Sequence, residues 1–140
     1  MLSSSGALLF DETDHGGLLL HPKLFVEVDP GIVQLARALL PPVIRQSLQP
    51  QRYPPHISVV RNEAGWTPAW KRMAIASSPQ TMTFEYDPEP VLGTTYAWLR
   101  VFAPDLTTLR LTLGLSPSSE WSRPPGDEEC FHCTIGNFKT

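Results

Sequence analysis

The stretch His56-Ile57-Ser58 recurs in altered form as His132-Cys133-Thr134, near the end of the 140-residue chain. Each stretch lies within a short run of apolar and β-branched residues, which is typical of a strand. Residues i and i+2 of a strand point to the same face, so each strand would present an imidazole beside a hydroxyl group. If the two strands face each other, one cleft would hold two histidines and two hydroxyls.

Similar elements precede the two stretches. Leu24–Val28 and Tyr96–Phe102 have the composition and alternation of strands. Asp29-Pro30 and Ala103-Pro104-Asp105 then begin helices, because proline is favoured as the first helical residue. Apolar residues recur at helical spacing in both helices: Ile32, Leu35, Ala36 and Leu39, then Leu106, Leu109 and Leu113 before the C-capping Gly114.

This repeat of strand, helix and histidine strand predicts an α+β domain with internal pseudo-twofold symmetry. We expect two lobes, with antiparallel sheets around a central cleft and helices on the outer faces. Met82–Tyr86 alternates like a further half-buried strand, and Ala7–Phe10 reads as a short one. One more helical turn is expected near Val43–Leu48, and a short helix from Thr67 through Ile75.

Length and composition favour a single domain spanning residues 1–140. The hydrophobic content of 41% is that of an ordinary globular protein. The sequence contains no run of about 18 apolar residues, so no membrane span is expected. The first residues lack the positive region of a signal peptide. We therefore expect a cytoplasmic protein, in the host cytoplasm if its origin is viral, and leave its oligomeric state open.

The charge balance bears on the class of ligand. The formal net charge is −3 at pH 7. Proteins that grip duplex nucleic acid through many phosphates carry a basic footprint, and none is visible here. The composition therefore disfavours a duplex partner and leaves a small nucleotide as the favoured one.

The two cysteines, Cys130 and Cys133, have the spacing of some zinc and redox sites. A structural zinc site needs four ligands, and the chain has no second cysteine pair. We interpret both as ordinary thiols and expect neither a metal nor another cofactor. His15 and His21 are expected at the surface, unless they line the cleft.

Two histidines and two hydroxyls in one cleft can perform acid–base chemistry near neutral pH. One imidazole would remove a proton from water or a sugar hydroxyl, and the other would protonate the leaving oxygen. A phosphodiester requires proton transfers at both of these oxygens. Ser58 and Thr134 would donate hydrogen bonds to the non-bridging oxygens and stabilise the charge that develops there.

Paired His-x-Ser/Thr motifs on the strands of a duplicated lobe resemble the 2H phosphoesterase superfamily. The matching stretches are Pro55-His56-Ile57-Ser58-Val59 and Phe131-His132-Cys133-Thr134-Ile135-Gly136. The resemblance covers the chain from about Leu24 to Lys139, with Ser58 standing in place of threonine. It implies that His56 and His132 are the acid–base pair, and that Ser58 and Thr134 are phosphate ligands.

The superfamily includes 2′,3′-cyclic phosphodiesterases, 2′-5′ oligoadenylate phosphodiesterases and phage enzymes that degrade cyclic oligonucleotide immune signals. The short, acidic chain is most similar in character to the compact viral members. A metal-independent phosphodiesterase that acts on a cyclic oligonucleotide, in viral evasion of host immunity, is therefore our first hypothesis. An RNA-processing phosphodiesterase is the alternative.

Several neighbouring side chains are candidates for substrate binding. Tyr96, Trp98 and Arg100 share one face of a strand, and aromatic rings and a guanidinium suit a base and a phosphate. The two rings could equally pack in the core. Tyr53 is a candidate for the cleft rim. Four other residues have weaker assignments: Arg61 and Lys139 as phosphate contacts or solvated charges, and Trp66 and Trp70 as one core residue and one lid residue.

Two other classes of function compete with this hypothesis. A serine hydrolase that uses Ser58 would need the Gly-x-Ser-x-Gly turn, which is missing around this residue. A non-catalytic nucleotide-binding module would need the pocket but not both histidines. The presence of both motifs favours the enzyme.

Overall fold

The computed structural model describes residues 1–11, 23–61, 69, 72–73, 76, 80–117 and 131–139. The sequence-based expectations for five residues fall outside these ranges: His15, His21, Trp66, Trp70 and Cys130. Of the helix expected from Thr67 to Ile75, three residues are described and all are helical: Ala69, Arg72 and Met73.

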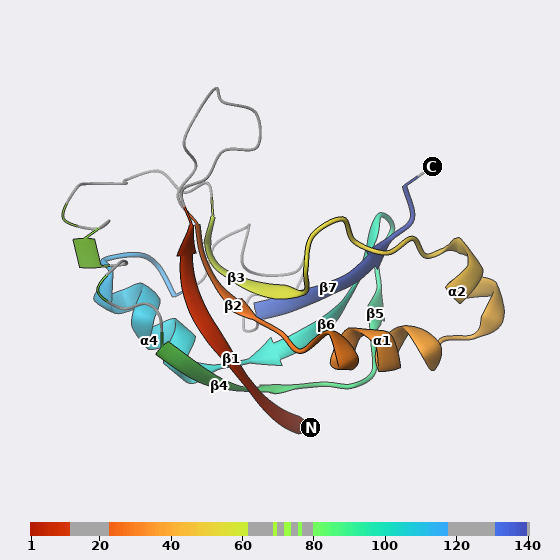
Figure 1. Ribbon diagram of the computed structural model, residues 1–140, viewed down its shortest axis with the longest axis horizontal. Coiled ribbons are helices and arrows are strands. Elements are labelled where there is room, and N and C mark those ends of the chain that lie inside the picture. Colours follow the sequence, from red (N-terminus) through yellow and green to blue (C-terminus); the bar gives the residue numbers. More distant parts are fainter. Residues whose placement is uncertain are drawn as a thin grey trace.

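The described elements form an α+β arrangement (Figure 1). In chain order they are β1 (Leu2–Asp11), β2 (Lys23–Glu27), α1 (Pro30–Ala38), α2 (Pro42–Ser47), β3 (His56–Arg61), β4 (Gln80–Tyr86), β5 (Val91–Leu92), β6 (Tyr96–Phe102), α4 (Pro104–Thr112) and β7 (Phe131–Asn137). The predicted α+β class is confirmed, and so is the order of strand, proline-initiated helix and histidine strand in each half.

The strands form one antiparallel sheet in the order β4-β1-β2-β3-β7-β6-β5. A further pairing of β4 with β6 closes six of the strands into a ring. This differs from the expected separate sheets, since the described strands belong to one continuous sheet. The two motif strands, β3 and β7, are neighbours in it, flanked by β2 and β6.

The N-terminal strand is longer than its sequence indicates. Only Ala7–Phe10 was predicted, because serines and a glycine, which have low strand propensity, fill the residues before it. In the structure β1 pairs with β4 from Leu2 to Leu8 and with β2 from Leu8 to Asp11. Backbone pairing on both sides outweighs the weak local preference.

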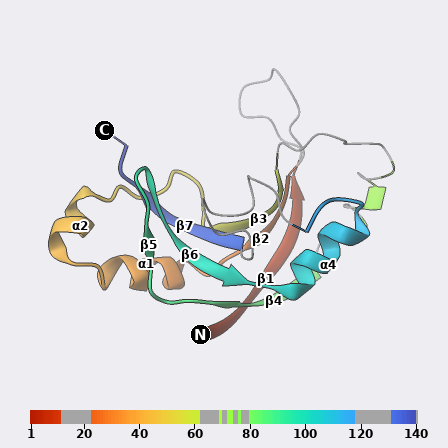
Figure 2. The ribbon, with the colours of Figure 1, turned by 180° about the vertical axis from the view of Figure 1, so that it is seen from behind.

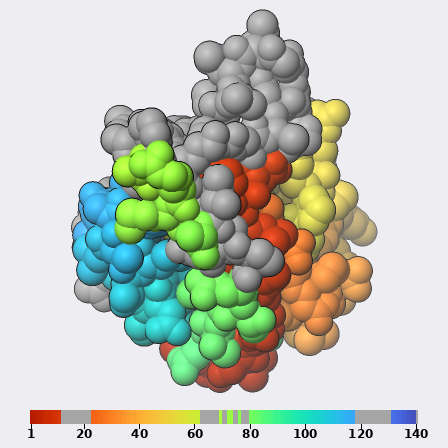
Figure 3. Space-filling view, turned by 60° about the vertical axis from the view of Figure 1, so that its left-hand side comes forward, coloured from red at the N-terminus to blue at the C-terminus, as the bar shows by residue number. Residues whose placement is uncertain are grey.

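The core is formed by side chains of the sheet and of two helices. Figures 1 and 2 show α1 and α4 at opposite ends of the sheet, and Figure 3 shows α4 beside β4 on one face. Buried side chains come from every long strand and from both helices: Leu8, Leu24, Val26, Ile57, Val59, Val60, Met82, Phe84, Ala97, Leu99, Val101, Phe131, Cys133, Ile135, Val33, Ala36 and Leu106. No helix in the described part of the chain is long and apolar enough to cross a membrane.

The buried face of α1 differs in part from the predicted stripe. Ala36 is buried as expected, but Leu35 and Leu39 are 59% and 72% exposed, and Val33, which was not in the stripe, is buried. Val33 is also at helical spacing from Ala36, so periodicity alone could not select the buried face. The position of the helix against the sheet makes the choice.

The predicted helix ends are confirmed. The Asp29 side chain accepts a hydrogen bond from the Gly31 backbone at 2.9 Å, which caps α1. Gly114 follows α4 with a φ angle of 80°, as expected of a glycine that ends a helix. Leu106 of α4 and the C-capping Leu113 are buried, and so is the charged Arg110 of the same helix, completely.

Candidate functional site

The pairing of β3 with β7 brings the two motifs together. Ile57 lies opposite Cys133 in an antiparallel register, and both side chains are buried. The residues before and after Ile57 and Cys133 therefore point away from the core, to the opposite face of the sheet. This register sets His56 toward Thr134, and Ser58 toward His132. The two histidines are diagonal neighbours, which in a regular ladder are about 7–8 Å apart.

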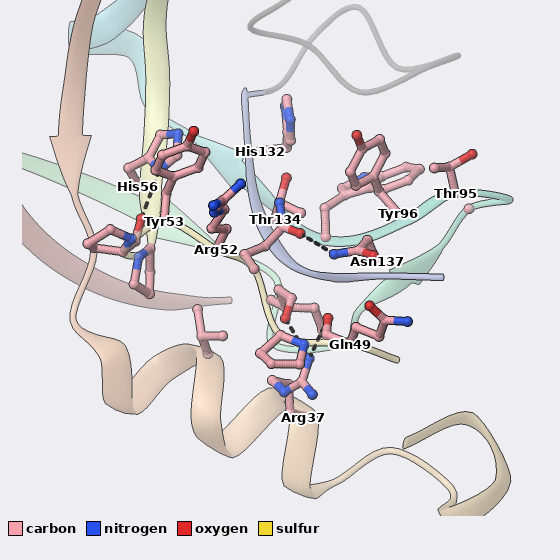
Figure 4. A pocket seen from close by; sticks show the side chains of 18 of the residues that line it. Arg37, Gln49, Arg52, Tyr53, His56, Thr95, Tyr96, His132, Thr134 and Asn137 are labelled. Carbon is pink, nitrogen blue, oxygen red and sulfur yellow. Dashed lines mark hydrogen bonds between the residues drawn. The ribbon is translucent and has the colours of Figure 1, made fainter. Parts of the chain in front are cut away.

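All four motif side chains line one pocket, with a volume of about 1360 Å³. Figure 4 shows Tyr53 and His56 on one side of this pocket and Tyr96 on the other. The Arg52 and Thr134 side chains lie between them. The cleft expected from the sequence is therefore present, and residues from both halves of the chain form it.

His56 is held by two contacts. Its Nδ1 lies 2.9 Å from the Pro54 carbonyl oxygen, and its ring contacts the edge of Phe25 at a centroid distance of 5.8 Å. A carbonyl oxygen only accepts, so Nδ1 donates, and the neutral ring keeps its lone pair on Nε2. Burial lowers the pKa of His56, and the Arg61 and Lys23 charges add to this, against the hydrogen bond to Pro54.

The aromatic candidates differ in exposure. Tyr53 and Tyr96 are 54% and 38% exposed. Trp98 also lines the pocket but is buried, with its ring against Gly93, where a Cβ atom would lie 2.5 Å from the indole. Trp98 therefore supports a wall of the pocket, whereas the two tyrosines present ring surface.

Arg100 shares the strand face of Trp98, as predicted, and lies opposite His132 in the register of β6 with β7. It is not among the residues that line the pocket. Its guanidinium carbon lies 5.0 Å from the Phe102 ring centroid, in cation–π geometry. The predicted contact between Arg100 and substrate is therefore not supported by its position.

Other cations do line the pocket. Arg61 and Lys139, considered from the sequence, are both present, and the Lys139 ammonium lies 4.9 Å from the Tyr96 ring centroid. Arg52 was not anticipated, since a lone arginine in a proline-rich connector carries no motif. Figure 4 shows its side chain between those of His56 and Thr134, which makes it a candidate anion ligand.

A second unanticipated feature lies on the side of the pocket formed by the end of β7 and the connector that contains Gln49. The backbones of Gln49 and Asn137 exchange hydrogen bonds of 2.8 and 2.9 Å. The Asn137 amide also donates to Gln51 at 2.8 Å. Arg37 of α1 donates to the Ile135 and Leu48 carbonyls, both at 2.9 Å. These contacts join a connector and a strand that are far apart in sequence, so local patterns could not reveal them.

Cys133 faces the core, opposite to its motif neighbours His132 and Thr134. Burial raises the pKa of its thiol to about 12. Across the described ranges, no three histidine, cysteine or acidic side chains gather as they would around a metal ion.

Comparison with known proteins leaves the site to be interpreted from its geometry. No family model matches the chain, and no curated protein or solved structure is significantly similar to it.

Proposed function

We propose that this protein is a metal-independent phosphodiesterase of the 2H type, with His56 and His132 as its acid–base pair. The observation that carries the proposal is the shared pocket, into which two adjacent strands bring both His-x-hydroxyl motifs. Two titratable imidazoles and two hydroxyl donors match the needs of phosphodiester cleavage.

The environment of His56 favours its role as the general base. Its pKa is lowered and its Nδ1 proton is directed at Pro54, so a neutral ring offers Nε2 to the proton of the nucleophile. His132, in protonated form, would give a proton to the leaving oxygen. Each transfer typically contributes about 10²–10⁴ in rate.

The remaining pocket residues can hold the phosphate. Ser58 and Thr134 each lie on the strand face of a motif histidine and would donate to the non-bridging oxygens. The Arg52 guanidinium would pair with the charge that develops on these oxygens. In this proposal, the base, the acid and the charge-stabilising groups would all contact one phosphate bound in the pocket.

The arrangement of the elements supports the two-lobed organisation of this family. The strand order β2-β3-β7-β6 reads the same from either half, with a histidine strand innermost on each side. In each half a proline-initiated helix, α1 or α4, lies between the outer and the inner strand in sequence. We include this pseudo-twofold relation in the proposal.

The exposed tyrosines favour a substrate with more than one base. Tyr53 and Tyr96 lie on opposite sides of the pocket, with Arg52 between them (Figure 4). Base–aromatic stacking is typically worth about 1–3 kcal/mol per base. A cyclic or linear oligonucleotide with a base on each side of the cleaved phosphate would use both rings. A 2′,3′-cyclic mononucleotide would use one, so we rank it second.

The test is a cleavage assay on cyclic dinucleotides and trinucleotides, 2′-5′ oligoadenylates and 2′,3′-cyclic nucleotides. We expect cleavage of a cyclic oligonucleotide, unaffected by EDTA and reduced about 10²–10⁴-fold by His56→Ala or His132→Ala. The assay also includes Thr134→Ala, which removes one of the two proposed phosphate donors. Its control is Thr112→Ala, which removes an exposed hydroxyl of α4. A cleavage rate in either histidine variant that equals the wild-type rate, or activity that EDTA abolishes, would contradict the mechanism.

The same assay separates the enzyme from a non-catalytic binding module. A binding module would retain a cyclic oligonucleotide in equilibrium dialysis, with every phosphodiester intact. Its affinity would also depend more on Tyr53 and Tyr96 than on the two histidines. Binding without cleavage under all conditions would replace our proposal with this one.

A further inference from the structure

Each motif is followed at once by a β-bulge. In the pairing of β2 with β3, Phe25 lies opposite Ser58 and Leu24 lies opposite Val60. Val59 is therefore an extra residue with no partner on β2. A bulge bends its strand and leaves backbone polar groups unpaired, and it commonly directs a side chain at a site.

The second motif has the same feature at the same position. In the pairing of β6 with β7, Trp98 lies opposite Thr134 and Ala97 lies opposite Gly136. Ile135 is therefore the extra residue. Both bulges directly follow the hydroxyl residue of a motif, and both bulged residues point into the core.

An arginine binds the carbonyl group of each bulged residue. The Arg110 Nη1 donates to the Val59 oxygen at 2.8 Å, and the Arg37 Nη1 donates to the Ile135 oxygen at 2.9 Å. Each guanidinium also holds the chain beside it: Arg110 donates to the Ser116 carbonyl at 2.8 Å, and Arg37 donates to the Leu48 carbonyl at 2.9 Å.

The two arginines have equivalent places in the sequence and act across the halves. Both lie in the last turn of the helix that follows the outer strand of their half, Arg37 in α1 after β2 and Arg110 in α4 after β6. The helix of the first half, however, binds the motif strand of the second, β7. The helix of the second half binds the motif strand of the first, β3.

Burying a guanidinium to bind backbone carbonyls costs free energy. Arg110 is fully buried, and a buried charge is strongly unfavourable without good hydrogen-bond partners. The carbonyl oxygens alone could be satisfied by a neutral donor or by water. A planar guanidinium holds two carbonyls at a fixed separation and angle, which lysine cannot do.

We propose that Arg37 and Arg110 are crossed positioning residues, each of which fixes the bulge that aims the motif hydroxyl of the opposite half. Arg37 sets the direction of Thr134 through Ile135, and Arg110 sets that of Ser58 through Val59. This inference rests on the proposed function for its catalytic consequence, and on the hydrogen bonds alone for its structural one.

The catalytic test is a double-mutant cycle with a cyclic adenosine dinucleotide as substrate. Arg37→Met should lower kcat by about 10–100-fold, with a smaller change in KM, as expected when a supporting contact is lost. The same change should have little further effect in Thr134→Ala, but its full effect in Ser58→Ala. Arg45→Met, which removes an exposed α2 arginine bonded to a carbonyl at 2.9 Å, is the matched control.

Arg110 is tested with Arg110→Lys, which keeps the positive charge but cannot hold the Val59 and Ser116 carbonyls together. Its loss of kcat should disappear in Ser58→Ala and persist in Thr134→Ala, the reverse of the Arg37 pattern. Equal losses in both backgrounds would show a general structural role for the arginines and overturn the proposal.

A measurement without substrate separates this inference from the proposed function. In Arg37→Met, amide hydrogen exchange should accelerate at Thr134, Ile135 and Gly136, while Ser58 and Val59 keep their protection. Uniform acceleration, or none, would contradict the crossed arrangement even in an active enzyme. The expected pattern in a protein that cleaves nothing would refute the proposed function alone.

Discussion

Gly136 gives the sharpest test of how the end of β7 packs against the Leu48–Gln49 connector beside the pocket. A Cβ atom at this position would lie 2.5 Å from the Arg37 Nη1, 2.6 Å from the Gln49 carbonyl oxygen and 2.6 Å from the Leu48 side chain. All three distances are shorter than a carbon atom tolerates. Gly136→Ala must therefore displace the Leu48–Gln49 connector, the arginine, or β7 itself.

The size of the effect follows from what can move. Arg37 has a flexible end, but its guanidinium is held by hydrogen bonds to Ile135 and Leu48. Gln49 is fixed by two backbone hydrogen bonds to Asn137. Since the obstacle includes fixed backbone, we expect the usual penalty of overpacking, about 1–3 kcal/mol of unfolding free energy. For a chain of this length, that penalty lowers Tm by about 3–12 °C.

The assay is urea unfolding of the wild-type chain, Gly136→Ala and the control Gly31→Ala. Gly31 lies in the first turn of α1, where the nearest atom to an added Cβ is the Asp29 carboxylate at 3.3 Å. Alanine is a better helix former than glycine, so the control should be neutral or slightly stabilised. If Gly136→Ala is as stable as the control, the packing of Arg37 and the connector against β7 is refuted.

Two further predictions concern titratable groups. Burial opposes protonation of His56, so the acidic limb of the pH–rate profile should lie below the ordinary histidine value of 6.5. The Arg61 charge also opposes protonation, so Arg61→Gln should move that limb to higher pH, and movement to lower pH would refute the assignment. Burial raises the pKa of Cys133 to about 12. In Cys130→Ser, where Cys133 is the remaining cysteine, its reaction with a maleimide should be more than about 100-fold slower in the folded chain than in denaturant. Equal rates would place the thiol at the surface.

Much of the local structure could be predicted because its signals are local. The helix starts at Pro30 and Pro104 follow from the fixed φ angle of proline, and the end of α4 follows from the conformational freedom of Gly114. Alternation of apolar and polar residues located β3 and β7, and gave the face on which each motif lies.

Other features depend on contacts between distant residues. The length of β1 is set by its two partner strands, and the buried face of α1 by the sheet that it contacts. Arg52 and Arg37 carry no motif, and their positions result from where the connector and the helix come to rest. Arg100, on the predicted strand face, contacts Phe102 instead of lining the pocket.

The sequence by itself determined the two His-x-hydroxyl strands, the elements that precede them and the chemistry that these side chains can perform. Strand periodicity is a local property, so each imidazole could be assigned to the same face as its hydroxyl. Only the tertiary structure decided that β3 and β7 are neighbours, with Ile57 opposite Cys133. Sheet order and register result from long-range backbone pairing and shared core packing, which no local pattern encodes. That pairing joins the two motifs in one pocket.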